Sequence, residues 1–187
     1  MRTRTLRAPL MATLLSGVAS LAAAQENPMV GGAAMPATNN IVENAVNSAD
    51  HTTLVAAVQA AGLAETLSGE GPFTVFAPTN AAFEALPPGT VDTLLLPENR
   101  EMLTEVLTCH VVGAEVFSDA IAGMIADGGG TYPVETLGGC VLQAQMNGDT
   151  ITLTDQQGQT ATVTIPDVDQ SNGVIHVIDT VMLPAAS

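Results

Sequence analysis

The sequence of 187 residues has no lysine, no tryptophan and only one tyrosine. Four arginines stand against 19 acidic residues, and the formal net charge is −15. Nucleic acids and anionic lipid surfaces are bound mainly through Lys and Arg, so this composition excludes both as partners. An acidic surface keeps a protein soluble and attracts cationic partners over long distances. The composition therefore favours a soluble protein, and cations are candidates for joining its acidic surface to a partner.

The few basic residues are concentrated at the N-terminus, where they predict a signal peptide. Residues 1–24 contain, in order, three arginines, an apolar run and a small-residue cleavage site: Arg2, Arg4 and Arg7, residues 10–21, and Ala22-Ala23-Ala24. This order is typical of a secretory signal peptide, and the apolar run is too short for a membrane span. A retained N-terminal anchor helix is the alternative. Cleavage would leave Arg100 as the only basic residue of a periplasmic or extracellular protein that does not insert into the membrane.

Cysteine is also scarce, since Cys109 and Cys140 are the only two. In a chain exported to an oxidising compartment, an even number of cysteines predicts a disulfide. A bridge between them would close a loop of about 30 residues and stabilise the fold by roughly 3 kcal/mol. Two separately buried thiols are the alternative.

The pattern of apolar residues divides the chain into a linker and one domain. Residues 25–38 are rich in Gly, Pro and Ala without periodicity, which predicts a flexible linker. Residues 39–184 fit one domain of usual size. Apolar residues follow helical spacing mainly before Thr131 and alternate mainly after it. Helices first and strands second, in one short chain, predict an α+β fold.

Aromatic side chains are few as well, and three of the four phenylalanines lie in residues 71–83. This stretch begins as a strand, with Phe73 and Val75 on one face and the intervening residues on the other. Pro78 has no amide hydrogen, so the strand ends there. Asn80 then has the side chain of a helix N-cap. We expect this strand to lie in the core, because it carries most of the large aromatic surface.

Two further patterns predict strands near the C-terminus. Residues 174–183 are apolar at nearly every position, which is typical of a strand buried on both faces. Asn147-Gly148 lies between two alternating segments and predicts a hairpin in which both turn residues have positive φ.

The residue types that carry chemistry do not form the motif of an enzyme or of a metal site. The sequence has no Gly-x-Ser-x-Gly elbow, no phosphate-binding loop with its lysine and no EF-hand spacing. Apolar neighbours predict that His110 and His176 are buried neutral rings bonded to backbone carbonyls, whereas His51 is expected in solvent. We therefore predict no enzymatic activity, no cofactor and no metal site. A weak surface calcium contact stays open at three aspartates: Asp155, Asp167 and Asp169.

Two motifs about a hundred residues apart resemble the two signatures of fasciclin domains. The first is TVFAPTNAAF at residues 74–83, and the second is NGVIHVID at residues 172–179, followed by VMLP at residues 181–184. The resemblance covers residues 39–184. It implies a wedge of two small β-sheets flanked by an N-terminal helical layer. It also implies a non-enzymatic binding module that mediates cell adhesion or contact with a protein or another macromolecule of the cell surface, envelope or matrix.

The same resemblance, with the motif positions, predicts the residues at or near the contact region: Thr79, Asn80, His110, Val111 and Val112. The family often has a tyrosine before the central histidine, where this chain has Cys109. Receptor contact of the kind implicated in animal members is therefore not expected at this position. The alternative function is a carrier of a small apolar ligand in a cavity of the wedge, which the high apolar fraction of the chain favours.

Overall fold

The computed structural model describes residues 27–185, so the predicted signal peptide, residues 1–24, lies outside the described residues. The helices are α1 (Ile41–Asn47), α2 (Thr52–Ala61), α3 (Ala64–Leu67), α4 (Asn80–Glu84), α5 (Thr90–Leu94), α6 (Arg100–Thr108) and α7 (Ser118–Asp127). The strands are β1 (Phe73–Pro78), β2 (Val111–Val112), β3 (Thr131–Glu135), β4 (Val141–Asn147), β5 (Thr150–Thr154), β6 (Thr160–Gln170) and β7 (Gly173–Ile178). Within residues 27–185, no helix has the length and hydropathy that a membrane span needs. The predicted α+β class is confirmed.

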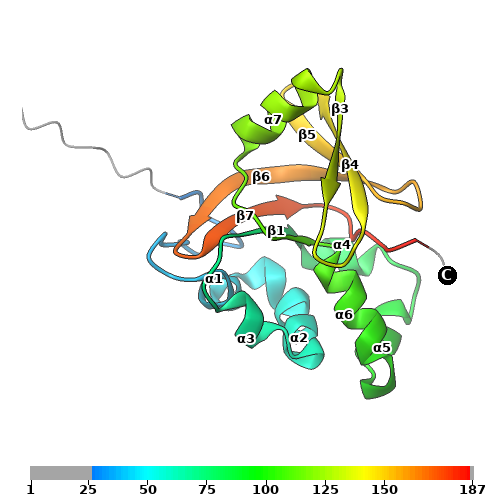
Figure 1. Ribbon diagram of the computed structural model, residues 1–187. Coiled ribbons are helices and arrows are strands. Elements are labelled where there is room, and N and C mark those ends of the chain that lie inside the picture. The colour runs from blue at the N-terminus through cyan, green and yellow to red at the C-terminus, as the bar shows by residue number, and fades with distance from the viewer. Residues whose placement is uncertain (1–26, 186–187) are drawn as a thin grey trace, which may run out of the picture.

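The strands form one mixed sheet of seven in the order β2-β1-β7-β6-β5-β4-β3, so the two sheets of the predicted wedge are joined. The joining strand is β6, which pairs with β5 through residues 160–162 and with β7 through residues 163–170. Its pairing with β7 is interrupted by two register shifts. Bulges of this kind bend a strand and increase its twist, and the hairpin of β3 and β4 rises steeply from the plane of β1, β7 and β6 (Figure 1).

The two motifs form neighbouring strands at the centre of the fold. β1 lies parallel to β7 along its whole length, from the pair Phe73 and Gly173 to the pair Pro78 and Ile178. Gly173 has φ of 151°, and a Cβ there would lie 1.9 Å from the carbonyl oxygen of Phe73, so only glycine allows this close approach. The prediction that β7 is buried on both faces is confirmed, although the strand ends at Ile178 rather than at residue 183.

The sheet separates two apolar clusters, and β1 contributes to both. Val75 and Ala77 belong to the cluster under α1, α2 and α6, which we call the helix-side core. Phe76 belongs to the cluster that lies between the two halves of the sheet and α7, which we call the wedge-side core. This is the predicted alternation along β1. Figure 1 shows the two layers, with α1, α2, α3, α5 and α6 on one side of β1 and β7 and with α7 on the other.

Part of the predicted linker is packed against the domain. Val30 and Met35 are buried in the helix-side core. The Asn27 side chain donates to the carbonyl oxygens of Met35 at 2.7 Å and of Asp169 at 2.5 Å, and its oxygen accepts from the Asp169 amide at 3.0 Å. Residues ahead of position 39 therefore contribute apolar side chains to the core and side-chain hydrogen bonds to the backbone of β6.

The start of α4 differs from the sequence prediction by one residue. Thr79, and not Asn80, is the N-cap of α4, and its hydroxyl accepts from the Ala82 amide at 3.4 Å. The end of β1 decides between these adjacent capping residues, because Thr79 is still extended and its amide still bonds to the Ile178 carbonyl at 3.2 Å, so the helix begins at Asn80. At α7, Phe117 holds the N-cap position and Ser118 is the first helical residue.

A side chain remote in sequence caps α7. The Asp167 carboxylate on β6 accepts from both the amide and the hydroxyl of Ser118, and these two bonds cap the start of α7.

The β4–β5 hairpin turns at Gly148 and Asp149, one residue later than predicted, and of these two only Gly148 has positive φ. A glycine at the first central position is typical of a type II′ turn.

Asn172 joins three elements through one amide group, which leads to a prediction about stability. Its nitrogen donates to the carbonyl oxygens of Leu67 at 2.8 Å and Gly69 at 2.9 Å, and its oxygen accepts from the Ile41 amide at 3.0 Å. The three neutral hydrogen bonds contribute roughly 1 kcal/mol each, and the exposed Gly69 carbonyl can bond to water in the variant. We therefore expect Asn172→Ala to lower the free energy of unfolding by about 2 kcal/mol. Urea unfolding measures the change. Asn147→Ala, at an exposed position, should stay within about 0.5 kcal/mol of the unmodified protein, and equal losses in the two variants would contradict the assignment.

Candidate functional site

The predicted binding residues at the end of β1 form a structural junction. The Asn80 oxygen accepts from the Thr53 amide at 3.0 Å and the Thr52 hydroxyl at 3.2 Å, and its nitrogen donates to the Ala49 carbonyl at 2.9 Å. Asn80 thus ties the first turn of α4 to the start of α2. Both Thr79 and Asn80 are partly exposed, but the amide of Asn80 is engaged in these bonds.

His110 lies in the core after α6, as predicted, and is 2% exposed. The amide of Met182 donates to its Nε2 at 3.0 Å, so the ring proton is on Nδ1, which donates to the Val106 carbonyl at 2.8 Å. Burial lowers the pKa of His110 to about 4, outweighing the Val106 bond and the charge of Asp155, which both raise it. At neutral pH the ring is therefore uncharged and holds the C-terminal segment onto α6.

Val111 and Val112 point to opposite sides of the sheet. Val111 is buried in the helix-side core, and Val112 is half-buried and packs against the wedge-side core. β2 pairs only with β1 and is the edge of the sheet at this end. The five predicted residues therefore occupy two separate places, a polar junction at α4 and the edge strand beside α6.

The other two histidines also hold backbone segments. The Asp167 amide donates to His176 Nδ1 at 3.2 Å, so Nε2 carries the proton and donates to the Val116 carbonyl at 2.8 Å. His51 is 3% exposed and bonds to the Ser48 hydroxyl at 2.8 Å, so the expectation of a solvated ring is wrong. Its burial is tertiary in origin, because the ring reaches the Ala77 carbonyl on β1 at 3.4 Å. Burial lowers the pKa of both rings.

Two of the three aspartates considered for calcium, Asp155 and Asp167, use their carboxylates within the fold, whereas Asp169 bonds to Asn27 through its backbone. Asp155 is buried and accepts from the amides of Gln157, Gln159 and Leu183 at 2.8–2.9 Å. Asp167 is engaged with Ser118 as described above. Among residues 27–185, no three acidic, histidine or cysteine side chains converge in the manner of a metal site.

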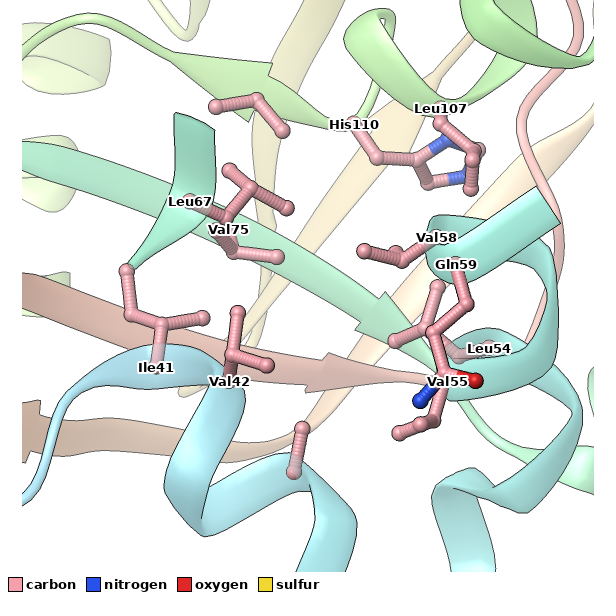
Figure 2. A pocket seen from close by; sticks show the side chains of 12 residues that line it. Ile41, Val42, Leu54, Val55, Val58, Gln59, Leu67, Val75, Leu107 and His110 are labelled. Atoms are coloured by element: carbon pink, nitrogen blue, oxygen red, sulfur yellow. The ribbon is translucent and has the colours of Figure 1, made fainter. Parts of the chain in front are cut away.

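A small apolar cavity lies between α1, α2 and β1, and the predicted residues His110 and Val111 line it. Figure 2 shows side chains from α1, α2 and β1 pointing into it, among them Ile41, Val58 and Val75. Its volume is about 30 Å³, whereas pockets for small ligands have roughly 300 to 1,000 Å³. This cavity is a packing defect of the helix-side core and not a site for an organic ligand.

Filling this cavity should stabilise the protein. Val58→Ile adds one methylene group to a buried residue that lines it, and a buried methylene contributes about 0.8 kcal/mol. We expect the free energy of unfolding in urea to rise by about that amount. Val168→Ile, at a residue that is 0% exposed and does not line the cavity, should be neutral or destabilising because the close-packed core has no space for the methylene. Equal changes in the two variants would contradict this account.

A larger cleft of about 570 Å³ opens on the other side of the sheet, between β1, β2, α7 and β3. Its floor consists of buried side chains of the wedge-side core, including Phe76, Ile121 and Val134. Thr74 also lies there, but its hydroxyl is occupied, since it donates to the Ala114 carbonyl at 2.6 Å and accepts from the Val116 amide at 2.9 Å. The floor therefore offers an apolar surface.

The rim of the cleft carries its polar groups. Tyr132 is half-buried and Glu135 is exposed, both on β3, and Glu135 is the only charged residue among the described residues that line the cleft. The sequence analysis missed this site, except for Val112. One signal for the cleft was present in the sequence: the single tyrosine stands beside Pro133, in a strand that has β4 on one side and, within the described residues, no strand on the other.

Comparisons with known proteins identify relatives over most of the chain. The family model of the fasciclin domain matches residues 49–184. Protein sll1483 of Synechocystis sp. is 45% identical over 167 residues, which cover 89% of this chain and 86% of that protein. The transforming growth factor-beta-induced protein ig-h3 of Sus scrofa is 37% identical over 134 residues, covering 72% of this chain but only 18% of that protein.

A comparison of folds gives the same relationship. A FAS1 domain pair from the insect cell adhesion molecule Fasciclin I matches 80% of this chain and 51% of that chain, with a TM-score of 0.69 and 15% sequence identity. At this identity the likeness concerns the fold alone. The predicted resemblance to fasciclin domains is thus confirmed in both sequence and fold.

Proposed function

This chain belongs to the fasciclin domain family, and from this membership we propose that it is a secreted or periplasmic binding module without enzymatic activity. It mediates cell adhesion or contact with a protein of the envelope or matrix. The observation that carries the proposal is the match over residues 49–184, together with the fold shared with a cell adhesion molecule. The buried disulfide between Cys109 and Cys140 supports export to an oxidising compartment.

The burial of the predicted residues narrows the proposed contact surface. His110 and Val111 are buried and support the fold from within, whereas Thr79, Asn80 and Val112 keep part of their surface in solvent. The surface has a single basic side chain, Arg100, within residues 27–185. We propose that the partner meets an acidic surface, either through basic side chains or through bridging cations.

A deletion strain of the organism that encodes the chain tests this function. We expect reduced surface attachment, reduced aggregation or a weakened envelope, restored by expression of the full chain. Binding of the labelled protein to intact cells, with calcium and with a chelator, separates cation bridging from direct contact. A deletion strain with unchanged attachment, aggregation and envelope integrity would contradict the proposal.

A second function is supported by one observation, the cleft of about 570 Å³ over an apolar floor. Its size falls in the range of small-molecule sites, so the protein is also proposed as a carrier of a small apolar ligand. Native mass spectrometry of protein purified from its host should then show a bound molecule. Protein that is fully ligand-free, and that binds no apolar probe in solution, would remove this function.

A further inference from the structure

The cleft is closed at one end by contacts between the two edges of the sheet. β2 and β3 are the first and last strands in the sheet order. Just beyond β3, the Leu137 amide donates to the Val111 carbonyl at 2.8 Å and the Gly138 amide donates to the Thr108 carbonyl at 3.0 Å. The disulfide from Cys109 fixes the same end. From there the two edges diverge, and α7 and the segment before it cover the gap.

The edge of β3 is unsuited to pairing with another strand. The Thr136 amide donates to the Cys140 carbonyl at 3.0 Å, and bonding in an antiparallel pair alternates along the strand. Pro133 therefore faces away from β4, at the centre of the free edge, where it offers no amide hydrogen. An added peptide strand would lose a central bond, so the occupant of the cleft is a side group or a small molecule rather than a backbone.

The charges around the cleft select the polar end of such a molecule. Glu135 lines the rim of the cleft, and its carboxylate attracts an organic cation. The ring of Tyr132 lines the cleft from the opposite face of β3, because side chains alternate along a strand. Arg100 does not compensate for this charge, because its Nε donates to the Ala61 carbonyl at 3.1 Å on the helix-side of the sheet. A fatty acid would bring a second carboxylate to Glu135 without a basic partner.

We propose that this cleft binds an amphiphile with an apolar tail and a cationic head group. The tail lies on Phe76 and Ile121, and the cation lies at the rim beside Glu135. The inference rests on the second function proposed above and adds the chemical class of the ligand. The apolar floor provides affinity, and the charge of Glu135 provides the selection between head groups.

Calorimetry with three probes of equal tail length tests the proposal: dodecyltrimethylammonium, dodecyl maltoside and dodecanoate, each below its micelle concentration. We expect the cation to bind about tenfold more tightly than the neutral probe, and dodecanoate to bind most weakly. Glu135→Gln should reduce the advantage of the cation to twofold or less. Glu101→Gln removes the same charge from the exposed surface of α6 and should leave the advantage unchanged.

A blocking variant and a spectroscopic signal locate the binding site. Ala114→Phe places a ring at the exposed rim of the cleft and should weaken binding of all three probes at least tenfold. Ala60→Phe, at an exposed position of α2, is the matched control. In the unmodified protein the methyl resonances of Ile121 should shift on addition of the cation, and this measurement does not depend on the folding of any variant.

The outcomes distinguish failure of the carrier function from failure of the proposed selection of a cationic head group. Absence of binding for all three probes would overturn both the carrier function and the inference. Equal affinity of the cationic and neutral probes, or the same loss in Glu135→Gln and Glu101→Gln, would overturn the selection of a cation and leave a carrier of apolar molecules. Binding that is unaffected in Ala114→Phe, with unchanged Ile121 resonances, would place the ligand outside the cleft and overturn the inference.

Discussion

Replacement of both Cys109 and Cys140 by alanine is expected to lower the free energy of unfolding by about 3 to 4 kcal/mol. The disulfide joins residues separated by 31 positions, and restricting a loop of this length in the unfolded chain gives an effect of that size. The loop contains β2, α7 and β3, so the bridge connects the two ends of the sheet order that no strand pairing joins. Urea unfolding of the double variant measures the loss.

Two further measurements distinguish loss of the bridge from loss of side-chain packing. The protein with intact but reduced thiols should be destabilised nearly as much as the alanine variant, because both lack the cross-link. Hydrogen exchange should accelerate most in α7 and β3, which lie inside the loop, and least in β7, which lies outside it. A double variant within about 1 kcal/mol of the oxidised protein would show that the bridge is energetically redundant.

The central strands could be predicted because their patterns are local. The alternation of Val75 and Phe76 across two faces, the stop at Pro78 and the nearly continuous apolar run of the last strand all follow from the geometry of strands and proline. The parallel register of β1 and β7 could not be predicted, since it depends on the close approach at Gly173 that only the assembled sheet reveals.

The sequence pattern did not predict the burial of residues that contact partners far away in the chain. His51 follows Ser48 and Asp50 in a polar turn, and its burial results from the Ala77 carbonyl on β1. The segment from Asn27 to Met35 has no periodicity, yet Val30 is 2% exposed because the segment folds against β6. Contacts of this kind cannot be predicted from the composition of the surrounding segment.

The cleft was missed for a related reason. Its width depends on the angle between the two halves of the sheet, and this angle is set by the register shifts in β6. A proline inside a strand pattern is typical of a bulge, so Pro166, which precedes Asp167 with φ of 57°, was a second signal in the sequence besides Tyr132 and Pro133. The composition of β6 does not fix how far the bulges turn the strand, and so the cleft emerges only in the folded chain.

Acidification is the second change with a large expected effect, and it acts through His110. Its pKa is about 4 in the folded protein against 6.5 for an exposed histidine. Above pH 6.5 the ring is neutral in both states and its contribution is unaffected. As pH falls from 6.5 towards 4, the unfolded state takes up a proton that the folded state does not, so stability decreases. The loss from this one residue reaches about 3 kcal/mol near pH 4.

The low pKa of His110 results from the position of its ring in the fold. A proton on Nε2 would face the Met182 amide, a donor that needs an acceptor at that place. Asp155 is the acidic group whose charge opposes this effect and raises the pKa, but burial outweighs it. His51 and His176 change stability in the same direction, because burial lowers the pKa of each.

Comparison with His110→Gln isolates the contribution of this residue. Glutamine supplies an acceptor and a donor but does not titrate in this range, so the carboxylates and the other two histidines act equally in both proteins. Between pH 7 and pH 4 the unmodified protein should lose about 3 kcal/mol more than the variant in urea unfolding. Titration of the ring resonances by NMR checks the pKa directly in the unmodified protein. A titration midpoint of the ring near pH 6.5, or parallel pH profiles of stability for the two proteins, would contradict the role of His110 as a neutral ring that joins α6 to the C-terminal segment.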